Sequence, residues 1–253
     1  MSTALLLTRA DADNQRLAAK LQRHGVRALS VPLLEIVAEA ETPRQRSMLL
    51  DLDRYHAVMA VSPIAASFGL QRLDSYWPQP PAGVEWFAVG PGTAAVLENY
   101  GLSTRFPDDG QDSEALLRLP EWKRLLTLPD LRVMIWRGVG GREYFSSTLR
   151  AAGGQVDLLE LYQRVMPDGL AQQLSAVAED GAKGIVILSG QALQHWQRAA
   201  GTGWEQQRHW RCWVPGVRIA ALAQQLGCTD IVSCQGADDA SVLAAVIAHP
   251  LTP

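Results

Sequence analysis

The feature that most constrains the fold is an internal repeat with a period of about 125 residues. The stretch WFAVGPGTAAVLENYGL, residues 86–102, has a counterpart in CWVPGVRIAALAQQLGC, residues 212–228. Each is an apolar run followed by a glycine and a helix-like segment, with a second glycine eleven residues after the first. The period is too long for a solenoid of short repeats. We therefore expect two similar domains that arose by duplication.

Other positions keep the same spacing in both copies. Arg9 and Ser62 lie 53 residues apart, and Arg137 and Ser189 lie 52 residues apart. The next glycine of the pattern follows these serines after 28 residues in the first copy and 27 in the second. Each of these positions comes directly after a short apolar run. The repeat therefore extends over most of each half of the chain.

Each copy alternates short apolar runs with helical patterns. The expected strands lie at 4–8, 27–32, 56–61, 84–89 and 103–106, and then at 132–136, 155–161, 184–188, 211–214 and 229–233. The expected helices lie at 11–23, 43–52, 63–73, 92–100 and 112–119, and then at 141–152, 168–180, 190–200, 217–226 and 238–248. Continuous apolar strands are typical of parallel sheets covered on both faces. The pattern predicts an α/β protein with two flavodoxin-like, doubly wound parallel-sheet domains.

Composition excludes several classes of protein. With 47% hydrophobic and 19% charged residues, the 253-residue chain can form packed cores. A net charge of -3 without any basic run argues against a nucleic-acid partner. No apolar stretch approaches the ~20 residues that span a bilayer, and the start of the chain lacks the pattern of a signal peptide. We expect a cytoplasmic protein without a membrane partner.

Cysteine and histidine usage argues against disulfides and metal sites. An odd number of cysteines, Cys212, Cys228 and Cys234, indicates reduced thiols. The five histidines are scattered, without the close spacing of metal ligands. We therefore expect no bound metal.

In a doubly wound sheet, ligands bind beyond the carboxyl ends of the strands. Helix N-termini in such loops offer unpaired N–H groups and a partial positive charge, and so favour anions. The candidate ligand-binding residues in these loops are Arg9, Ser62, Gly90, Thr93, Arg137, Gly138, Gly141, Ser189, Gly216 and Arg218. Capping of the following helices is the alternative role for the hydroxyls of Ser62, Thr93 and Ser189. As a set in two domains, the loops favour a ligand with several anionic groups.

The loop GVGGRE, residues 138–143, tests for a nucleotide site. It follows an expected strand and opens an expected helix, but Glu143 occupies the place of the third glycine of a dinucleotide fingerprint. A nucleotide-dependent enzyme is therefore weakly supported. The two copies also differ: in LLELYQR, Tyr162 carries a phenol where the aligned Leu34 is apolar. Such differences fit two domains with unequal tasks and an asymmetric ligand.

The ordered set of motifs resembles the uroporphyrinogen-III synthase family over essentially the whole chain. The motifs, in order, are LLLTR, AVSPIAA, VGPGTA, WRGVGGRE, LLELYQR, ILSGQAL and VPGVRIAALAQQLG. The resemblance implies two flavodoxin-like domains joined by a two-stranded linker, with the first strand–helix–strand unit assigned to the C-terminal half. One domain would comprise residues 1–35 and 166–253, and the other residues 39–161. Residues 36–38 and 162–165 would be the linkers, which places Tyr162 at the cleft.

The resemblance also implies a reaction and a set of roles. The family converts hydroxymethylbilane, a linear tetrapyrrole with eight carboxylates, into uroporphyrinogen III with loss of water and inversion of ring D, in heme biosynthesis. No cofactor is implied, and we expect a monomer. Tyr162 is the candidate catalytic acid. Ser62, Thr93 and Ser189 stand where relatives place ligand-contacting hydroxyls, whereas Arg218 stands where many relatives have a small hydroxyl residue.

Two questions stay open at the level of sequence. Arg9 and Arg137 either neutralise substrate carboxylates or pair with nearby acids. A two-domain binding or sensor protein for an anionic small molecule, without turnover, is the alternative to the enzyme, because fold alone does not fix function.

Overall fold

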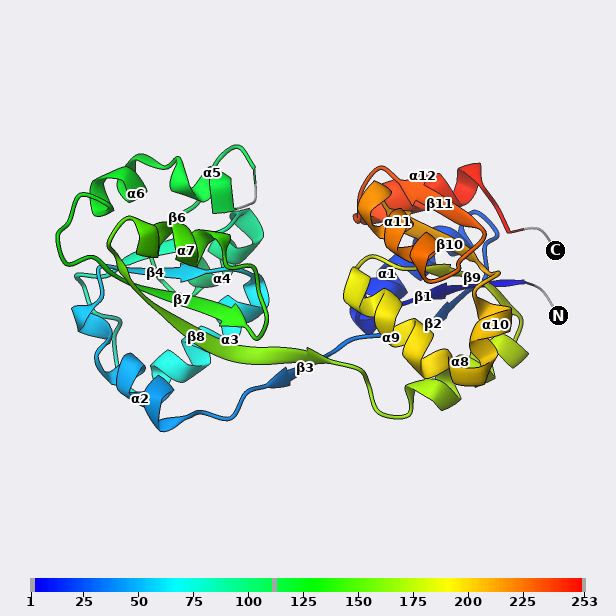
Figure 1. The fold of residues 1–253 in the computed structure, drawn as a ribbon, viewed down its shortest axis with the longest axis horizontal. Helices are drawn as coiled ribbons and strands as arrows, with labels where there is room; N and C mark the ends of the chain where they lie inside the picture. The colour runs from blue at the N-terminus through cyan, green and yellow to red at the C-terminus, as the bar shows by residue number, and fades with distance from the viewer. Residues whose placement is uncertain (1–2, 111–112, 252–253) are drawn as a thin grey trace. The chain divides into compact units, whose positions relative to one another are not determined.

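The structure is a computed structural model that describes residues 3–110 and 113–251 (Figure 1). The chain forms two compact units and passes between them twice. The first unit runs to Glu35 and resumes at Val165, and the second comprises Ile36–Arg164. Each unit contains its own parallel sheet, so the predicted α/β class with two parallel-sheet domains is confirmed.

Within the described residues, the sheet of the first unit has five strands in the order β2-β1-β9-β10-β11. All its neighbouring strands are parallel. The strands are β1 (Ala4–Leu7), β2 (Ala28–Ser30), β9 (Ala182–Val186), β10 (Arg211–Pro215) and β11 (Ile231–Cys234). In the chain order of this unit, the arrangement reads 2-1-3-4-5, which is the flavodoxin-like order.

Helices cover both faces of this sheet. Successive strand residues point to opposite faces, so Leu6 packs in one core and its neighbours Leu5 and Leu7 pack in the other. The Leu6 face is covered by α8 (Leu170–Glu179), α9 (Gly190–Ala200) and α11 (Val217–Gln225). The opposite face is covered by α1 (Asp11–Gln22) and α12 (Asp239–Ala248). Burial on both faces explains why the strands are continuously apolar.

The second unit has, within the described residues, six strands in the order β3-β8-β7-β4-β5-β6. The ladder from β8 to β6 is parallel. The strands are β3 (Glu35–Ala38), β4 (Ala57–Ala60), β5 (Glu85–Ala88), β6 (Thr104–Arg105), β7 (Arg132–Gly138) and β8 (Gln155–Val165).

This sheet also has a core on each face. Figure 1 shows the helices that cover the two faces. Val58 and Ala60 of β4 pack with α2 (Pro43–Leu50), α3 (Pro63–Asp74) and α4 (Pro91–Asn99). Ala57 and Met59 face the other way, toward α5 (Ser113–Leu117), α6 (Pro120–Leu125) and α7 (Tyr144–Ala151).

The boundaries of the sequence repeat differ from the boundaries of the structural units. By the repeat, β1 and β2 correspond to β7 and β8, and β4, β5 and β6 correspond to β9, β10 and β11. In the sheets, however, β1 pairs with β9, and β7 pairs with β4. Apart from the additional edge strand β3, each unit therefore takes two strands from one copy and three from the other. The two sheets keep equivalent strand orders, because β7 and β8 occupy in the second sheet the positions that β1 and β2 occupy in the first.

Several elements differ from the sequence-based expectation. The edge strand β3 was absent from the strands expected from apolar runs, because EIVA mixes charged and apolar residues and is largely solvent-exposed; only the family resemblance had pointed to a linker strand at 36–38. Short elements also lay outside the periodic patterns: α6, α10 (Trp204–Gln207), and the 3-10 turns Leu52–Arg54 and Gly201–Gly203. The helix expected from residue 141 begins at Tyr144, and the first residue of the helix expected at 112–119 lies outside the described residues.

The segments predicted as linkers, residues 36–38 and 162–165, fall within β3 and β8, which are neighbours in the second sheet. Their role as a linker, and the exact domain limits, stay predictions. Among the described residues, no helix combines the length and apolar character that crossing a membrane would need.

Candidate functional site

In the first unit, the carboxyl ends of β1, β9 and β10 lie level in the sheet, because Leu7 pairs with Val186 and Val186 pairs with Trp213. The loops that follow these strands carry the predicted residues Arg9, Ser189, Gly216 and Arg218. These residues therefore lie at one edge of the sheet, as expected from the sequence.

Arg9 has an acidic partner. Its Nη2 lies 2.5 Å from Oδ1 of Asp239, at the start of α12. The same carboxylate lies 2.8 Å from Arg16 Nε and 2.8 Å from Lys20 Nζ, both on α1. These contacts, led by the hydrogen bond from Arg16, hold the pKa of Asp239 well below its usual range, although partial burial opposes the shift. Of the two roles left open for Arg9, pairing with an acid is the one present in this structure.

Ser189 caps α9: its Oγ accepts a hydrogen bond of 3.1 Å from the backbone N–H of Ala192. Gly216 precedes α11 with φ of 80°, a left-handed value that favours glycine. The next two residues, Val217 and Arg218, are exposed. The capping role predicted for Ser189 is confirmed, and substrate contact at these positions stays a prediction.

In the second unit, β4, β5 and β7 also end level, since Ala60 pairs with both Ala88 and Trp136. Ser62 caps α3 by accepting a hydrogen bond of 3.0 Å from Ala65 N–H, as predicted. The capping interpretation of Thr93 was wrong. Gly90 is the N-cap of α4, and Thr93 lies inside the helix with its side chain buried. The proline-glycine pair between these two residues moves the helix start ahead of the threonine.

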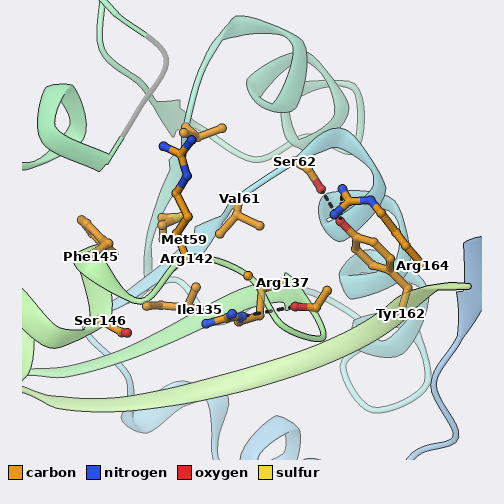
Figure 2. Close-up of a pocket in the computed structure, with 13 residues that line it drawn as sticks. Met59, Val61, Ser62, Ile135, Arg137, Arg142, Phe145, Ser146, Tyr162 and Arg164 are labelled. Atoms are coloured by element: carbon orange, nitrogen blue, oxygen red, sulfur yellow. Dashed lines mark hydrogen bonds between the residues drawn. The ribbon is translucent and has the colours of Figure 1, made fainter. Parts of the chain in front are cut away.

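A pocket of about 270 Å³ opens at this edge of the second sheet (Figure 2). Five of the predicted residues line it: Ser62, Arg137, Gly138, Gly141 and Tyr162. Gly90 and Thr93 do not line it. Met59, Val61, Val89, Ile135 and Phe145 form its apolar wall. In the described part of the chain, its lining includes arginines but no Asp or Glu. An apolar wall beside cationic groups suits a flat organic ring that carries carboxylates.

Tyr162 is buried, and its ring packs against two neighbours. The ring stacks on Phe68 of α3, with centroids 6.0 Å apart and planes 24° apart. It also lies against Gly138, where an added Cβ would be 2.7 Å from ring carbons. Its Oη lies 3.2 Å from Ser62 Oγ. The phenol is thus fixed at the pocket by packing, and its oxygen is left to make polar contacts.

An irregularity in β8 places Tyr162 opposite Gly138. Arg137 pairs with Glu160, but the next residue, Gly138, pairs with Tyr162, so the register shifts by one residue at Leu161. Bulges of this kind re-aim side chains and are frequent next to functional sites. The backbone N–H of Val139 then donates to the carbonyl of Tyr162 at 2.8 Å. Sequence spacing alone gave no signal of this shift.

Arg137 is a buried cation, with its side chain only 4% exposed. Its Nε donates to the carbonyl of Gly138 at 3.2 Å and lies 4.0 Å from an oxygen of Glu160. An added Cβ at Gly141 would lie 2.7 Å from Nη2 of Arg137, so this glycine leaves room for the guanidinium. Because the Glu160 contact is long and Glu160 is 41% exposed, pairing with an acid only partly satisfies Arg137.

Sequence reasoning missed three polar residues that line the pocket: Arg142, Ser146 and Arg164. Arg142 belongs to the GVGGRE loop, which was tested only for its glycines. Arg164 follows Tyr162 by two residues on β8, and its Nη2 lies 3.3 Å from the phenolic oxygen. Alternation along a strand was the available signal for Arg164, since residues two apart share a face.

Comparisons with known proteins agree on one family. The family model described as "Uroporphyrinogen-III synthase HemD" matches residues 15–244. The uroporphyrinogen-III synthase of Salmonella typhimurium is 36% identical over 96% of this chain and 99% of its own. The enzyme of that name from Escherichia coli is 32% identical over the same shares.

Two solved structures share the fold. A mutant uroporphyrinogen III synthase from Thermus thermophilus gives a TM-score of 0.62 at 12% identity, covering 96% of this chain and 97% of its own. Uroporphyrinogen-III synthetase from Helicobacter pylori gives 0.55 at 12% identity, covering 96% and 98%. From the family model and the sequence relatives, the chain belongs to the uroporphyrinogen-III synthase family.

Proposed function

We propose that this protein converts hydroxymethylbilane into uroporphyrinogen III, with loss of water and inversion of ring D. Family membership over nearly the whole chain supports this activity. The observation that carries the proposal is the position of Tyr162, whose phenol lies at a pocket lined by apolar side chains and arginines. The substrate combines pyrrole rings, which can pack on the apolar side chains, with eight carboxylates, which can pair with the arginines.

Tyr162 is the proposed acid of the first step. Its proton passes to the terminal hydroxyl of the substrate, the C–O bond breaks with its electron pair on oxygen, and water leaves. The substrate becomes a cation stabilised by pyrrole nitrogen, and the tyrosine becomes a phenolate. The substituted α-carbon of ring D attacks this cation and gives a spiro intermediate. The bond between that carbon and the bridge from ring C then breaks, with its electron pair on ring D, and leaves a new cation on ring C. The free α-carbon of ring D attacks this second cation and loses its proton, and this proton restores the phenol. Net loss of one water is balanced, and the acid is regenerated.

Positioning supplies the rest of the proposed catalysis. The substrate must bend until its two ends meet, and holding reacting groups in place can contribute several kcal/mol, up to roughly 7–11 in the best cases. In the second unit, Arg137, Gly138, Gly141 and Ser62 are the proposed contacts at the pocket, and Gly90 and Thr93 lie on the loop and helix beside it. In the first unit, Arg9, Ser189, Gly216 and Arg218 are the proposed contacts.

The test is to supply hydroxymethylbilane, made in situ by its synthase, and to resolve the uroporphyrinogen isomers after oxidation. Formation of the type III isomer supports the proposal. Formation of the uncatalysed type I isomer alone would show that the protein is not this enzyme. Tight binding of the bilane with its recovery unchanged would instead support a binding or sensor protein.

Tyr162→Phe tests the proposed acid. We expect turnover to fall by about tenfold or more, with circular dichroism and thermal stability unchanged, because general acid catalysis contributes roughly 10²–10⁴-fold. Tyr100→Phe is the matched control, since the Tyr100 hydroxyl pairs with Asp74 and Tyr100 does not line the pocket. Full turnover in Tyr162→Phe would reduce this tyrosine to a packing role.

A cytoplasmic location and a monomeric state are proposed from the sequence. Sedimentation equilibrium at micromolar concentration tests the monomeric state, and a mass of two chains would contradict it. Fractionation of the producing cell tests the cytoplasmic location.

A further inference from the structure

We propose that Arg164 is a positioning residue that acts through Tyr162. Its guanidinium donates a hydrogen bond to the phenolic oxygen and stabilises the negative charge that this oxygen carries after giving up its proton. The inference rests on the proposed function, and it concerns a residue outside the set expected from sequence.

The two side chains meet on one strand. Tyr162 and Arg164 are two residues apart in β8 and so project from the same face. Nη2 of Arg164 lies 3.3 Å from Oη of Tyr162, and the guanidinium carbon lies 5.5 Å from the ring centroid (Figure 2). Both residues line the pocket.

The hydrogen-bond roles follow from chemistry. A guanidinium has only donors, so Arg164 donates and the oxygen of Tyr162 accepts. The tyrosine O–H is then left for another acceptor. Ser62 Oγ lies 3.2 Å away and also accepts the N–H of Ala65 at 3.0 Å. The phenol proton is therefore directed to the side of Ser62, which also lines the pocket, and a substrate hydroxyl there would take it.

Charge explains why this contact matters during the reaction. Neutral phenol gains little from a nearby cation, whereas the phenolate left after proton transfer gains a charge-assisted hydrogen bond. An interaction that is stronger after proton transfer lowers the barrier to that transfer. Loss of one preorganised donor to a developing oxyanion typically costs about 10²–10³-fold. Because Arg164 is exposed and water screens its charge, we expect a smaller effect of about tenfold.

The ring itself does not need Arg164 to stay in place. The ring packs on Phe68 and against Gly138, and Tyr162 is only 1% exposed. Removing the guanidinium should therefore change the chemistry of the oxygen while leaving the ring where it is. This separates the proposed role from simple packing.

The experiment compares Arg164→Met, which keeps an unbranched chain over the ring without a donor, with Arg164→Lys, which keeps a charged donor. Arg54→Gln is the control for loss of one arginine charge in the same unit; Arg54 is 65% exposed and pairs with Asp51. We expect Arg164→Met to lower kcat about tenfold with little change in KM, and Arg164→Lys to keep most of the activity. In a Tyr162→Phe background, Arg164→Met should have almost no further effect.

Three results with the Arg164 variants would overturn the inference: wild-type kcat and KM in Arg164→Met, wild-type kcat with a raised KM in that variant, or multiplied effects in the double variant. The second and third would mean that Arg164 contacts the substrate directly. Full activity of Tyr162→Phe would also overturn it, while type III product from the wild-type protein would leave the proposed function standing. Absence of type III product from the wild-type protein is the separate result that rejects the function itself.

Discussion

The ring of Tyr162 packs directly against the backbone of Gly138, on the neighbouring strand. The distance leaves no space for a side chain: a Cβ on Gly138 would lie 2.7 Å from two ring carbons and 3.1 Å from the carbonyl oxygen of Tyr162. The backbone of Gly138 is not left-handed. The requirement for glycine is therefore one of space, and it comes from the tyrosine.

Gly138→Ala should consequently behave as a defect in Tyr162. The ring must shift, which disturbs the contact of its oxygen with Ser62, so we expect turnover to fall by at least about tenfold, as for loss of the phenol. Overpacking should also cost about 1–3 kcal/mol in the free energy of unfolding. Gly83→Ala, in the same unit with no atom within 4 Å of the added Cβ, is the control for both measurements. Normal turnover in Gly138→Ala would show that the ring position is unimportant.

Gly69 should be required for the packing of α3 on β7. In an exposed helix, Gly→Ala stabilises by about 1 kcal/mol. At Gly69, however, the added Cβ would lie 2.0 Å from a ring carbon of Trp136, which is fully buried. We expect Gly69→Ala to lower the free energy of unfolding by about 1–3 kcal/mol, measured in urea. Gly92→Ala, in α4 with its nearest atom at 4.0 Å, should be neutral or stabilising. The same effect in both variants would contradict the packing argument.

The carboxylate of Asp239 should make the first unit sensitive to acid. Its pKa is lowered in the folded state, so the unfolded chain takes up the proton first as pH falls. The stabilisation is complete above the unfolded value of about 4 and is lost as pH falls through the lower folded value. We expect Asp239→Asn to cost about 1–2 kcal/mol at pH 7 and progressively less below pH 4.

The control for this prediction is Asp180→Asn, which removes a single exposed ion pair with Arg27 in the same unit. Its cost should stay within about 1 kcal/mol. If Asp239→Asn lowered the free energy of unfolding by the same amount from pH 7 to pH 3, the stabilising role of the ionised carboxylate would be contradicted.

The cysteine thiols should be unreactive in the native protein. Cys212, Cys228 and Cys234 are buried, and burial raises the pKa of Cys228 and of Cys234 to about 11 and that of Cys212 well above its ordinary value. Since the thiolate is the nucleophile, we expect slow modification by a disulfide reagent at pH 8 and rapid modification of all three in denaturant. Rapid native labelling of Cys212 would contradict its burial.

The same thiols should weaken the fold in alkali. Their folded pKa values lie above the unfolded value of about 8.5, so their contribution is intact below that pH and is lost as pH rises toward about 11. Denaturation midpoints measured from pH 8 to 10.5 check this. In Cys234→Ala, the denaturation midpoint should fall less steeply with pH. An unchanged slope would show that other groups cause the loss of stability.

Much of the local structure was predictable from the residues themselves. The apolar runs that became β1, β4, β7 and β9 could satisfy their burial only as central parallel strands. Ser62 and Ser189 each follow a strand and precede a helix, so their capping roles depend on neighbours three residues away. Family membership was likewise visible in the order of the motifs. These features persist because short-range geometry and apolar periodicity encode them.

What only the tertiary structure decided is which distant residues meet. The sequence established a duplicated α/β chain with its candidate residues after the strands. It could not show that Arg137, Arg142 and Arg164 share one pocket, or that Asp239 contacts Arg9 across 230 positions. The one-residue shift in β8 that brings Tyr162 to Gly138 was equally invisible. Strand pairing, register and side-chain packing depend on the summed burial of a whole unit, so no local segment carries them by itself.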